Sequence, residues 1–353
     1  VNTPESNIMA AAELAVGLAF CVFRNIPQAN AAGRRGDFRR NMFIGNELDG
    51  KVAGIIGLGR IGSIVATKLR GCNMKVIAYD PYIADEKFRK YGVQKCETLE
   101  ELLRKSDLIT IHTPKTSETY GMIGEKELEM CKEGVRIVNA ARGGLVNEKA
   151  LYNAIKAGRV AGAGIDVLDP EPGYDKKPEE QDYKNPLLEF DNVIITPHLG
   201  ASTKEANYNV GTCVAELVAD ALNDKMVAAV NMPPMKHVDL SELKPYLEIA
   251  EMLGKIYYQT EKDTVQKIEI IYSGDLAGKE TKVITLSALK GFLDPVIKEK
   301  VNYVNAELML KNMGIQLTES TNSKLDKYTN LITLKFTTIT RQLAVSGTVF
   351  AKE

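Results

Sequence analysis

The chain has 353 residues, a length that predicts two or three domains. Its composition, 44% hydrophobic and 26% charged, is typical of a folded protein and unlike that of a disordered or collagen-like chain. Its 45 Lys and Arg against 46 Asp and Glu argue against a dedicated nucleic-acid binder. Five cysteines without a C-x-x-C pair predict neither disulfides nor a metal site and are typical of a cytoplasmic protein. The most apolar stretch, residues 8–23, is interrupted by Glu13 and falls short of the roughly 20 residues that span a bilayer, so we expect a buried helix and no membrane partner.

A glycine motif follows the first apolar strand of the chain, residues 51–56. It reads Gly57-Leu-Gly59-Arg60-Ile61-Gly62 and opens an amphipathic helix that stops near Gly71. In this context Gly57 allows a tight turn, Gly59 lets a pyrophosphate approach the backbone, and Gly62 lets the helix pack on the strand. The free N–H groups at the helix start attract anions. The motif therefore predicts a dinucleotide-binding unit with contacts from residues 57 and 59–62.

A carboxylate, Asp80, ends the second apolar strand, residues 75–80, and lies 18 residues after Gly62. At that spacing it is placed to hydrogen-bond both ribose hydroxyls and to repel a 2′-phosphate, which favours NAD over NADP. The alternative is a solvated turn residue before Pro81.

Strands and helices continue to alternate as far as residue 223. The pattern includes two capping boxes, at Thr98–Glu101 and Ser202–Glu205, and the second opens a long helix. This alternation predicts an α/β fold with a doubly wound, parallel, Rossmann-like sheet. The expected strands are residues 107–112, 135–141, 160–167 and 192–196, and the expected helices are residues 147–157 and 202–223.

The alternation stops around Asn231-Met-Pro-Pro-Met235, where the double proline predicts a linker. Beyond it we expect a smaller α+β domain. Its expected helices are residues 242–258 and 301–312, and its expected strands are residues 265–272, 315–319 and 331–340.

A series of motifs runs along the chain: Asn2-Thr-Pro-Glu-Ser-Asn7, Gly45-Asn-Glu-Leu-Asp-Gly-Lys51, Gly57–Gly62, His112-Thr-Pro114, Asn139-Ala-Ala-Arg142-Gly-Gly, Gly164-Ile-Asp166-Val, Glu171-Pro and Thr196-Pro-His198-Leu-Gly-Ala-Ser-Thr203. In this order they resemble the motifs of the D-isomer-specific 2-hydroxyacid dehydrogenases. The resemblance is strong from residue 1 to about 232 and implies an NAD-binding domain over residues 1–199 and a helical segment of the substrate domain over residues 200–232. Residues 236–353 resemble part of the intervening regulatory, allosteric substrate-binding-like domain of longer members.

Three side chains match the chemistry of moving a hydride from a secondary alcohol to a nicotinamide. His198, just past a strand end, can accept the hydroxyl proton as a neutral imidazole. Glu171, by resemblance, hydrogen-bonds the other ring nitrogen and favours the imidazolium form. Arg142 offers a planar fork for the substrate carboxylate. On chemistry alone, a backbone-bonded histidine, a loop-bracing arginine and a turn-ending glutamate are equally good interpretations.

The resemblance also implies further contacts with NAD. Asp166 would accept a hydrogen bond from the nicotinamide carboxamide, although an ordinary strand-end carboxylate is the alternative, and the backbone of Thr113 and Pro114 would lie beside the cofactor. Ala140, His198 and Gly200 complete the expected contacts. We interpret His112 as a packing residue and assign no role to His237.

Two groups of basic residues have a plain and a functional interpretation. Arg34, Arg35, Arg39 and Arg40 predict a solvated loop or, as the minority interpretation, a contact with a substrate phosphate. Lys290, Lys298, Lys300 and Arg341 predict a solvated face or an anionic effector site. The long polar stretch of residues 173–185 predicts a surface insertion.

The function implied by the resemblance is the NAD-dependent oxidation of 3-phospho-D-glycerate to 3-phosphohydroxypyruvate, which leads into L-serine biosynthesis, by a cytoplasmic homo-oligomer. The alternatives are a glyoxylate or hydroxypyruvate reductase, another D-2-hydroxyacid dehydrogenase, and an NAD-sensing corepressor-like protein. The family places about a hundred substrate-domain residues before Asn2, and its longer members end in an ACT domain. The resemblance therefore implies a fragment that binds NAD with little turnover.

Overall fold

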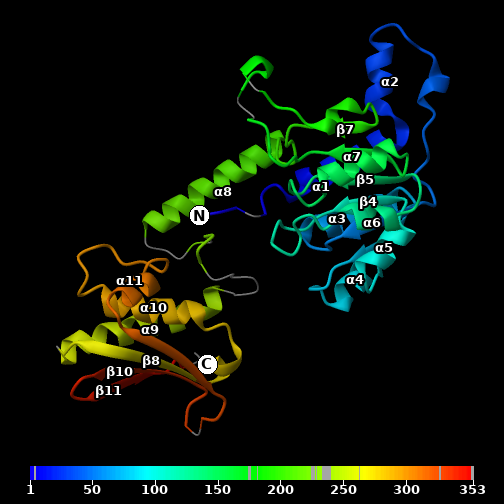
Figure 1. Cartoon of the computed structure of the whole chain (residues 1–353). Coiled ribbons are helices and arrows are strands. Elements are labelled where there is room, and N and C mark those ends of the chain that lie inside the picture. The colour runs from blue at the N-terminus through cyan, green and yellow to red at the C-terminus, as the bar shows by residue number, and fades with distance from the viewer. Residues whose placement is uncertain are drawn as a thin grey trace. The chain divides into compact units, whose positions relative to one another are not determined.

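The computed structural model describes residues 1–3, 5–173, 176–180, 182–223, 227, 229–232, 240–261, 263–325 and 327–350. The chain forms two compact units, one of residues 3–213 and one of residues 214–353 with residues 1–2 (Figure 1). The predicted linker prolines, Pro233 and Pro234, and His237 lie outside the described residues.

The first unit is built on a seven-stranded sheet with the strand order β3-β2-β1-β4-β5-β6-β7, and every neighbouring pair is parallel. The predicted doubly wound α/β fold is therefore confirmed. Its elements, with α8 continuing into the second unit, are α1 (Ile8–Arg24), α2 (Ile26–Gly33), η1 (Arg40–Phe43), β1 (Val52–Ile56), α3 (Arg60–Gly71), β2 (Lys75–Tyr79), α4 (Asp85–Tyr91), β3 (Gln94–Lys95), α5 (Leu99–Lys105), β4 (Leu108–Ile111), α6 (Glu125–Met130), β5 (Val135–Asn139), α7 (Glu148–Lys156), β6 (Val160–Ile165), η2 (Pro178–Glu180), η3 (Pro186–Glu189), β7 (Val193–Ile195) and α8 (Lys204–Leu222).

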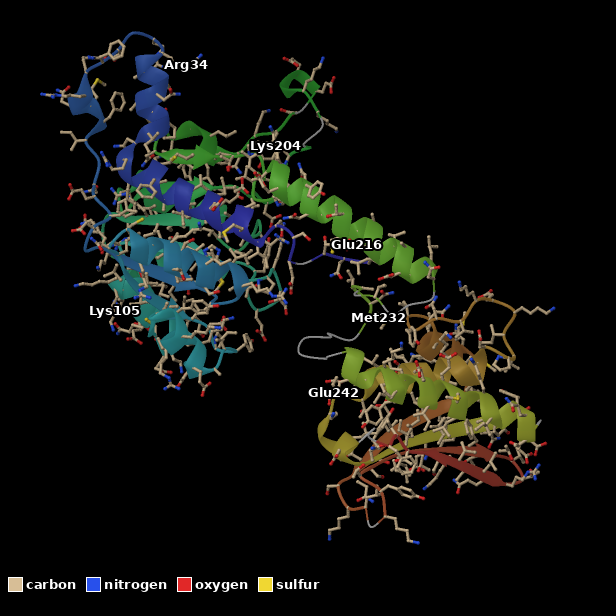
Figure 2. All side chains as sticks on the ribbon, turned by 180° about the vertical axis from the view of Figure 1, so that it is seen from behind. Arg34, Lys105, Lys204, Glu216, Met232 and Glu242 are labelled. Carbon is tan, nitrogen blue, oxygen red and sulfur yellow. The ribbon has the colours of Figure 1, made fainter. Side chains whose placement is uncertain are left out.

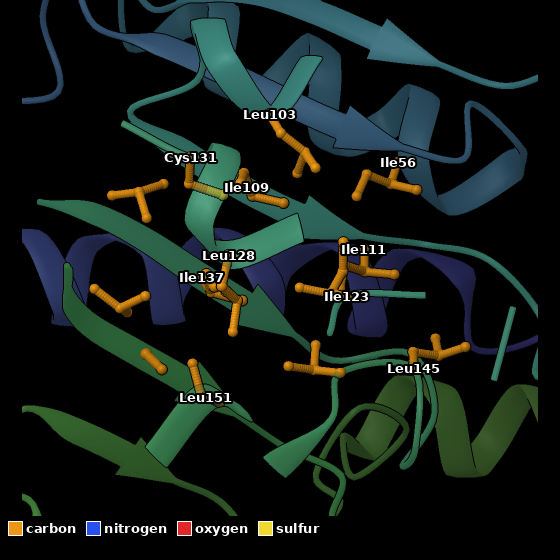
Figure 3. Close-up of a cluster of buried hydrophobic side chains, with 14 of the residues drawn as sticks. Ile56, Leu103, Ile109, Ile111, Ile123, Leu128, Cys131, Ile137, Leu145 and Leu151 are labelled. Carbon is orange, nitrogen blue, oxygen red and sulfur yellow. The ribbon is translucent and has the colours of Figure 1, made fainter. Parts of the chain in front are cut away.

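The sheet is buried on both faces, as a parallel sheet must be. Successive side chains of β4 show this, because Leu108 joins the core beneath α1 and α3, whereas Ile109 and Ile111 join the core beneath α5, α6 and α7. Figure 3 shows the second core, in which Leu103 and Leu128 contribute from the helices. Burial on both faces explains why these strands read as continuous apolar runs in the sequence.

The predicted buried helix near the N-terminus is confirmed as α1, in which seven side chains are buried. Within the described part of the chain, no single helix has the length and apolarity needed to cross a membrane, and only the bent pair α1 and α2, at 66°, passes on length and composition.

The two predicted capping boxes have different outcomes. Thr98 Oγ1 accepts a hydrogen bond from the Glu101 N–H at 3.1 Å, so Thr98 is confirmed as the cap of α5. The reciprocal half of the box differs, because Glu101 Oε2 accepts from the Glu97 N–H at 3.0 Å. At α8 the predicted cap, Ser202, is wrong by one residue, because Thr203 Oγ1 accepts from the Ala206 N–H at 3.0 Å. Ser202 instead donates its N–H to Leu199 O in the preceding turn.

The second unit is α+β, as predicted, with the strand order β11-β10-β8-β9. β8 and β9 are parallel, and the other pairs are antiparallel. The sequence patterns predicted neither α10 nor β11. The elements of this unit are α9 (Leu240–Thr260), β8 (Val265–Gly274), η4 (Asp275–Gly278), α10 (Lys282–Leu293), α11 (Ala306–Asn312), β9 (Gln316–Asn322), β10 (Asn330–Thr338) and β11 (Gln342–Gly347).

Candidate active site

The glycine turn between β1 and α3 has a backbone that side chains would obstruct. Gly57 has φ +90°, and a Cβ there would lie 2.7 Å from His112 O. A Cβ on Gly62 would lie 2.0 Å from Gly57 O, which is closer than real contacts allow. A Cβ on Gly59 would meet no atom within 4 Å, and no side chain caps α3 among the described residues. Open space in front of free helix N–H groups fits a pyrophosphate.

Asp80 follows β2 directly and borders this turn. Its Oδ2 accepts a hydrogen bond from the Leu58 N–H at 2.8 Å, and its Oδ1 accepts from the Tyr82 N–H at 3.0 Å. The carboxylate is therefore fixed against the glycine turn, which fits the predicted ribose contact better than a loose turn residue. The contact itself stays a prediction.

The segment after β4 lies next to the glycine turn. The His112 N–H donates to Ile56 O at 2.8 Å, so the two strands end side by side before their loops diverge. Thr113 packs its methyl group toward Gly57, and Pro114 O accepts from the Thr119 hydroxyl at 2.6 Å. In doubly wound folds, ligands bind at such a divergence.

His112 is half-buried next to this turn, and its Nε2 lies 2.9 Å from Thr110 Oγ1. Burial lowers its pKa to about 4 from 6.5. These contacts support the interpretation of His112 as a packing residue.

The lowered pKa of His112 predicts how the free energy of unfolding depends on pH. The unfolded chain binds a proton to this imidazole between pH 6.5 and 4 while the folded chain does not, so stability is complete above pH 6.5 and falls as the pH drops toward 4. From pH 7 to pH 4.5, His112 should remove about 2–3 kcal/mol from the free energy of unfolding. The free energy of unfolding of His112→Gln, measured by urea unfolding, should fall less steeply over that pH range. Parallel pH curves for the two proteins would contradict the prediction.

Arg142 lies in the loop after β5, and the buried Asn139 fixes that loop. Asn139 Nδ2 donates to Arg142 O at 2.9 Å, and Asn139 Oδ1 accepts from the Ala141 N–H at 3.1 Å. The Arg142 Nη1 donates to Ala141 O at 2.6 Å. No carboxylate pairs with Arg142 within the described part of the chain, so its charge is available to a ligand. The sequence placed Asn139 in a motif but indicated no role for it. Ala140, which follows Asn139, is half-buried.

Glu171 and His198 come together from the loops after β6 and β7. His198 Nδ1 lies 3.2 Å from Glu171 Oε1, and each side chain is 35% exposed. His198 has φ +53°, a left-handed conformation that is uncommon outside glycine. Arg142 follows β5, the neighbour of β6 in the sheet, so all three predicted catalytic residues lie at the same edge of the sheet.

Asp166, at the end of β6, holds the segment that carries His198. Its carboxylate is 1% exposed and accepts hydrogen bonds from the Thr196 hydroxyl at 2.5 Å, the Leu199 N–H at 2.7 Å and the Gly200 N–H at 3.0 Å. The His198 N–H donates to Asp166 O at 2.9 Å. These bonds fit an anchoring residue, so the cofactor contacts expected of Asp166 and Gly200 stay predictions.

Hydrogen bonds fix the two ends of the polar stretch after Glu171. Tyr183 Oη donates to Pro170 O at 3.1 Å, and Asn185 Nδ2 lies 3.2 Å from Tyr183 Oη. Asn185 Nδ2 also donates to Glu148 Oε2 at 2.5 Å. Within this predicted surface insertion, residues 174, 175 and 181 lie outside the described part.

Two of the predicted cofactor contacts have other described partners. Arg60 pairs with Glu5 at 2.6 Å, with both side chains largely exposed, and Ile61 packs at the border of the core. Among the described residues, no group of His, Cys, Asp and Glu side chains could hold a metal ion.

The contacts of the first basic group fit a solvated loop, whereas Lys290 in the second group is too buried to be part of a solvated face. Arg34 lies at the end of α2, on the outside of the first unit (Figure 2), and Arg35 and Arg40 are also exposed. Arg39 pairs with Asp37 at 2.7 Å. In the second unit, Lys290 is 14% exposed and pairs with Glu251 at 3.0 Å, Arg341 pairs with Glu261, and Lys298 and Lys300 are exposed.

Comparison with known families finds two matches. The D-isomer specific 2-hydroxyacid dehydrogenase, NAD binding domain, matches residues 16–200, just over half of the chain. The D-3-phosphoglycerate dehydrogenase intervening domain matches residues 242–353.

Curated relatives named D-3-phosphoglycerate dehydrogenase match nearly the whole chain. Those from Methanocaldococcus jannaschii, Archaeoglobus fulgidus and Bacillus subtilis are 42%, 40% and 40% identical over 99%, 100% and 96% of this chain. The chain spans only 65%, 66% and 62% of their respective lengths.

Solved structures match a smaller share of the chain. The pyruvate reductase of Chlamydomonas reinhardtii is 30% identical with a TM-score of 0.61, over 65% of this chain and 70% of its own. The D-lactate dehydrogenase from Aquifex aeolicus, complexed with NAD and lactic acid, is 29% identical with a TM-score of 0.57, over 63% of this chain and 68% of its own.

Proposed function

Because the chain belongs to the D-isomer-specific 2-hydroxyacid dehydrogenase family, we propose that it carries out the NAD-dependent oxidation of 3-phospho-D-glycerate to 3-phosphohydroxypyruvate, the first step of L-serine biosynthesis. The observation that carries the reaction type is the contact between His198 and Glu171 at the edge of the sheet that also bears Arg142. The substrate is supported by the names of the full-chain relatives and by the intervening-domain match.

His198 is the general base in this proposal. Its Nδ1–H donates to the Glu171 carboxylate, which leaves Nε2 as the acceptor for the proton of the substrate hydroxyl. As the imidazole gains that proton, the carboxylate at 3.2 Å stabilises the positive charge. The fixed loop after β7 keeps the ring in place.

Arg142 binds the substrate carboxylate with two parallel hydrogen bonds in this proposal. That carboxylate would lie next to the carbon that loses hydrogen, so the clamp orients the hydroxyl toward His198. Asn139 keeps the arginine loop in position through its two backbone bonds.

NAD supplies the hydride acceptor when it is bound. The open space at Gly59, the fixed Asp80 and the segment of Thr113 and Pro114 would hold it, with Ala140 at the border. Asp80 would favour NAD over NADP because of its charge.

The test is a substrate panel followed by NADH absorbance, with 3-phosphoglycerate, D-glycerate and D-lactate as hydroxy acids and with glyoxylate and hydroxypyruvate in the reverse direction. It should be run on this chain and, where the coding sequence extends beyond it, on the whole translated product. We expect the highest kcat/KM with 3-phosphoglycerate. Preference for an unphosphorylated acid would instead support a reductase or lactate-type enzyme, and NAD binding without turnover on any form would favour a sensor.

The role of Arg142 has its own variant in that assay. Arg142→Lys keeps the charge but loses the planar fork, so kcat/KM should fall about 10- to 100-fold for every hydroxy acid. The Kd for NAD should stay within about twofold. An unchanged kcat/KM would remove Arg142 from the proposal.

We further propose a cytoplasmic homo-oligomer. All five cysteines are free, which fits a reducing compartment. Phe38, Met42 and Ile44 are 83%, 57% and 79% exposed in the segment after α2, and such apolar surface supports self-association.

A further inference from the structure

A hydrogen bond joins two loops on either side of the glycine turn. Tyr82 follows Asp80 by two residues, and its hydroxyl donates to Glu118 Oε2 at 2.6 Å. Glu118 belongs to the loop after β4, and Tyr82 belongs to the loop after β2. Both side chains lie at the surface, with Tyr82 79% exposed.

The strand order determines what this bond crosses. β1 lies between β2 and β4, and all three strands are parallel, so their carboxyl ends share one edge. A contact from the loop after β2 to the loop after β4 must therefore pass across the carboxyl end of β1. The glycine turn begins there, and doubly wound folds bind their dinucleotide at this point. The Tyr82–Glu118 bond therefore lies across the entrance to the expected dinucleotide site, which we call the crevice.

Both ends of the bond are anchored. On one side, Asp80 Oδ1 accepts the Tyr82 N–H at 3.0 Å while Asp80 Oδ2 accepts the Leu58 N–H at 2.8 Å. On the other side, Thr119 Oγ1 accepts the Thr116 N–H at 2.8 Å, which closes the turn that contains Glu118. The hydrogen bond to Glu118, and to a smaller extent the charge of Asp80, raise the pKa of Tyr82, so both carboxylates act on the same phenol.

We propose that Glu118 is a second determinant of NAD over NADP, held at the crevice by Tyr82 and acting together with Asp80 from the opposite loop. The inference rests on the proposed function only in that this crevice binds the dinucleotide. A 2′-phosphate brings between one and two additional negative charges to the side of the crevice on which Asp80 lies. One carboxylate about 4 Å from such a group weakens its binding about three- to tenfold in water, and the effect fades toward a Debye length of about 8 Å.

The test compares the Kd values of NAD and NADP by calorimetry, which requires no turnover. Glu118→Gln should strengthen NADP binding about three- to tenfold and leave NAD within about twofold, and the gain should shrink at high salt. Tyr82→Phe keeps the ring but releases Glu118, so it should shift the ratio in the same direction by a smaller factor. The matched control is Glu129→Gln on α6, which removes an exposed charge at the opposite, amino edge of the sheet. Its position there is shown by Arg159, which directly precedes β6 and donates to the Glu129 carbonyl.

The outcomes separate this inference from the proposed function. An unchanged NAD-to-NADP ratio in Glu118→Gln, with NAD binding intact, would overturn the role of Glu118 alone. Equal shifts in Glu118→Gln and Glu129→Gln would also overturn it, because they would reflect net charge. Failure of the unaltered chain to bind either dinucleotide would count against the proposed function, and this inference would fail with it.

Discussion

His198→Ala is expected to lower kcat by about 10²- to 10⁴-fold while the Kd for NAD changes by less than about twofold. General bases contribute rate factors of this size, and the base acts only in the chemical step. The imidazole faces Glu171 through Nδ1, so its removal takes away the proton acceptor without disturbing the glycine turn. Steady-state kinetics with the preferred substrate of the panel, beside calorimetry for NAD, measure the two quantities.

Glu171→Gln is the matched comparison for His198→Ala. The amide can still accept the Nδ1–H hydrogen bond but no longer balances the imidazolium charge, so kcat should fall by a smaller factor. Equal turnover in His198→Ala and the unaltered protein would rule out the histidine as the base. A large loss of NAD affinity in the same variant would mean that the ring mainly contacts the cofactor.

Asp166→Ala should lower both the free energy of unfolding and kcat. The variant removes the acceptor of the buried Gly200 N–H and of two partly buried donors, the Leu199 N–H and the Thr196 hydroxyl. Unsatisfied buried donors of this kind cost about 1–3 kcal/mol each before relaxation, so a loss of about 2–4 kcal/mol is expected. Because His198 lies within this segment, kcat should fall at least tenfold. Urea unfolding and steady-state kinetics check the two effects.

The same variant distinguishes the two roles considered for Asp166. An anchor predicts reduced stability and kcat with NAD affinity within about twofold. A contact to the nicotinamide carboxamide predicts weaker NAD binding with little change in stability, and that result would contradict the anchoring interpretation. Asp166→Asn keeps the side-chain volume and one acceptor oxygen, but its NH2 group would face a backbone N–H donor. We therefore expect an intermediate loss of stability.

The fold of the first unit could be predicted because its signals are local. The glycine turn, the continuous apolar strands and the Thr98 cap each occupy a few consecutive residues. The parallel order of the strands then brings their carboxyl ends together, so Arg142, Glu171 and His198 lie at one edge although they are far apart in sequence. The sequence predicted their roles from motifs and resemblance, not this shared edge. The cap of α8 was misplaced by one residue because both Ser202 and Thr203 offer a hydroxyl, and only the turn from Leu199 selects Thr203.

Other features leave no local signal. α10 was not predicted because ten of its twelve residues are buried, so no polar stripe marks the helical period. The anchoring bonds of Asp166 and the bond from Tyr82 to Glu118 join residues 30 to 36 positions apart. Only the folded arrangement determines which of several polar side chains meet, so such partners could not be read from spacing.

The hydrogen bonds that close the two ends of the polar stretch after Glu171 make the position of this carboxylate independent of the length of the stretch. Tyr183 closes on Pro170, and Asn185 closes on Tyr183 and Glu148, so the two ends of the stretch are held by bonds rather than by the chain between them. The entropy of closing a flexible loop grows only with the logarithm of its length, by about 0.6 kcal/mol for each doubling. Residues can thus be gained or lost between these ends at little cost, and the segment beside the proposed base is free to diverge in evolution while Glu171 stays in place.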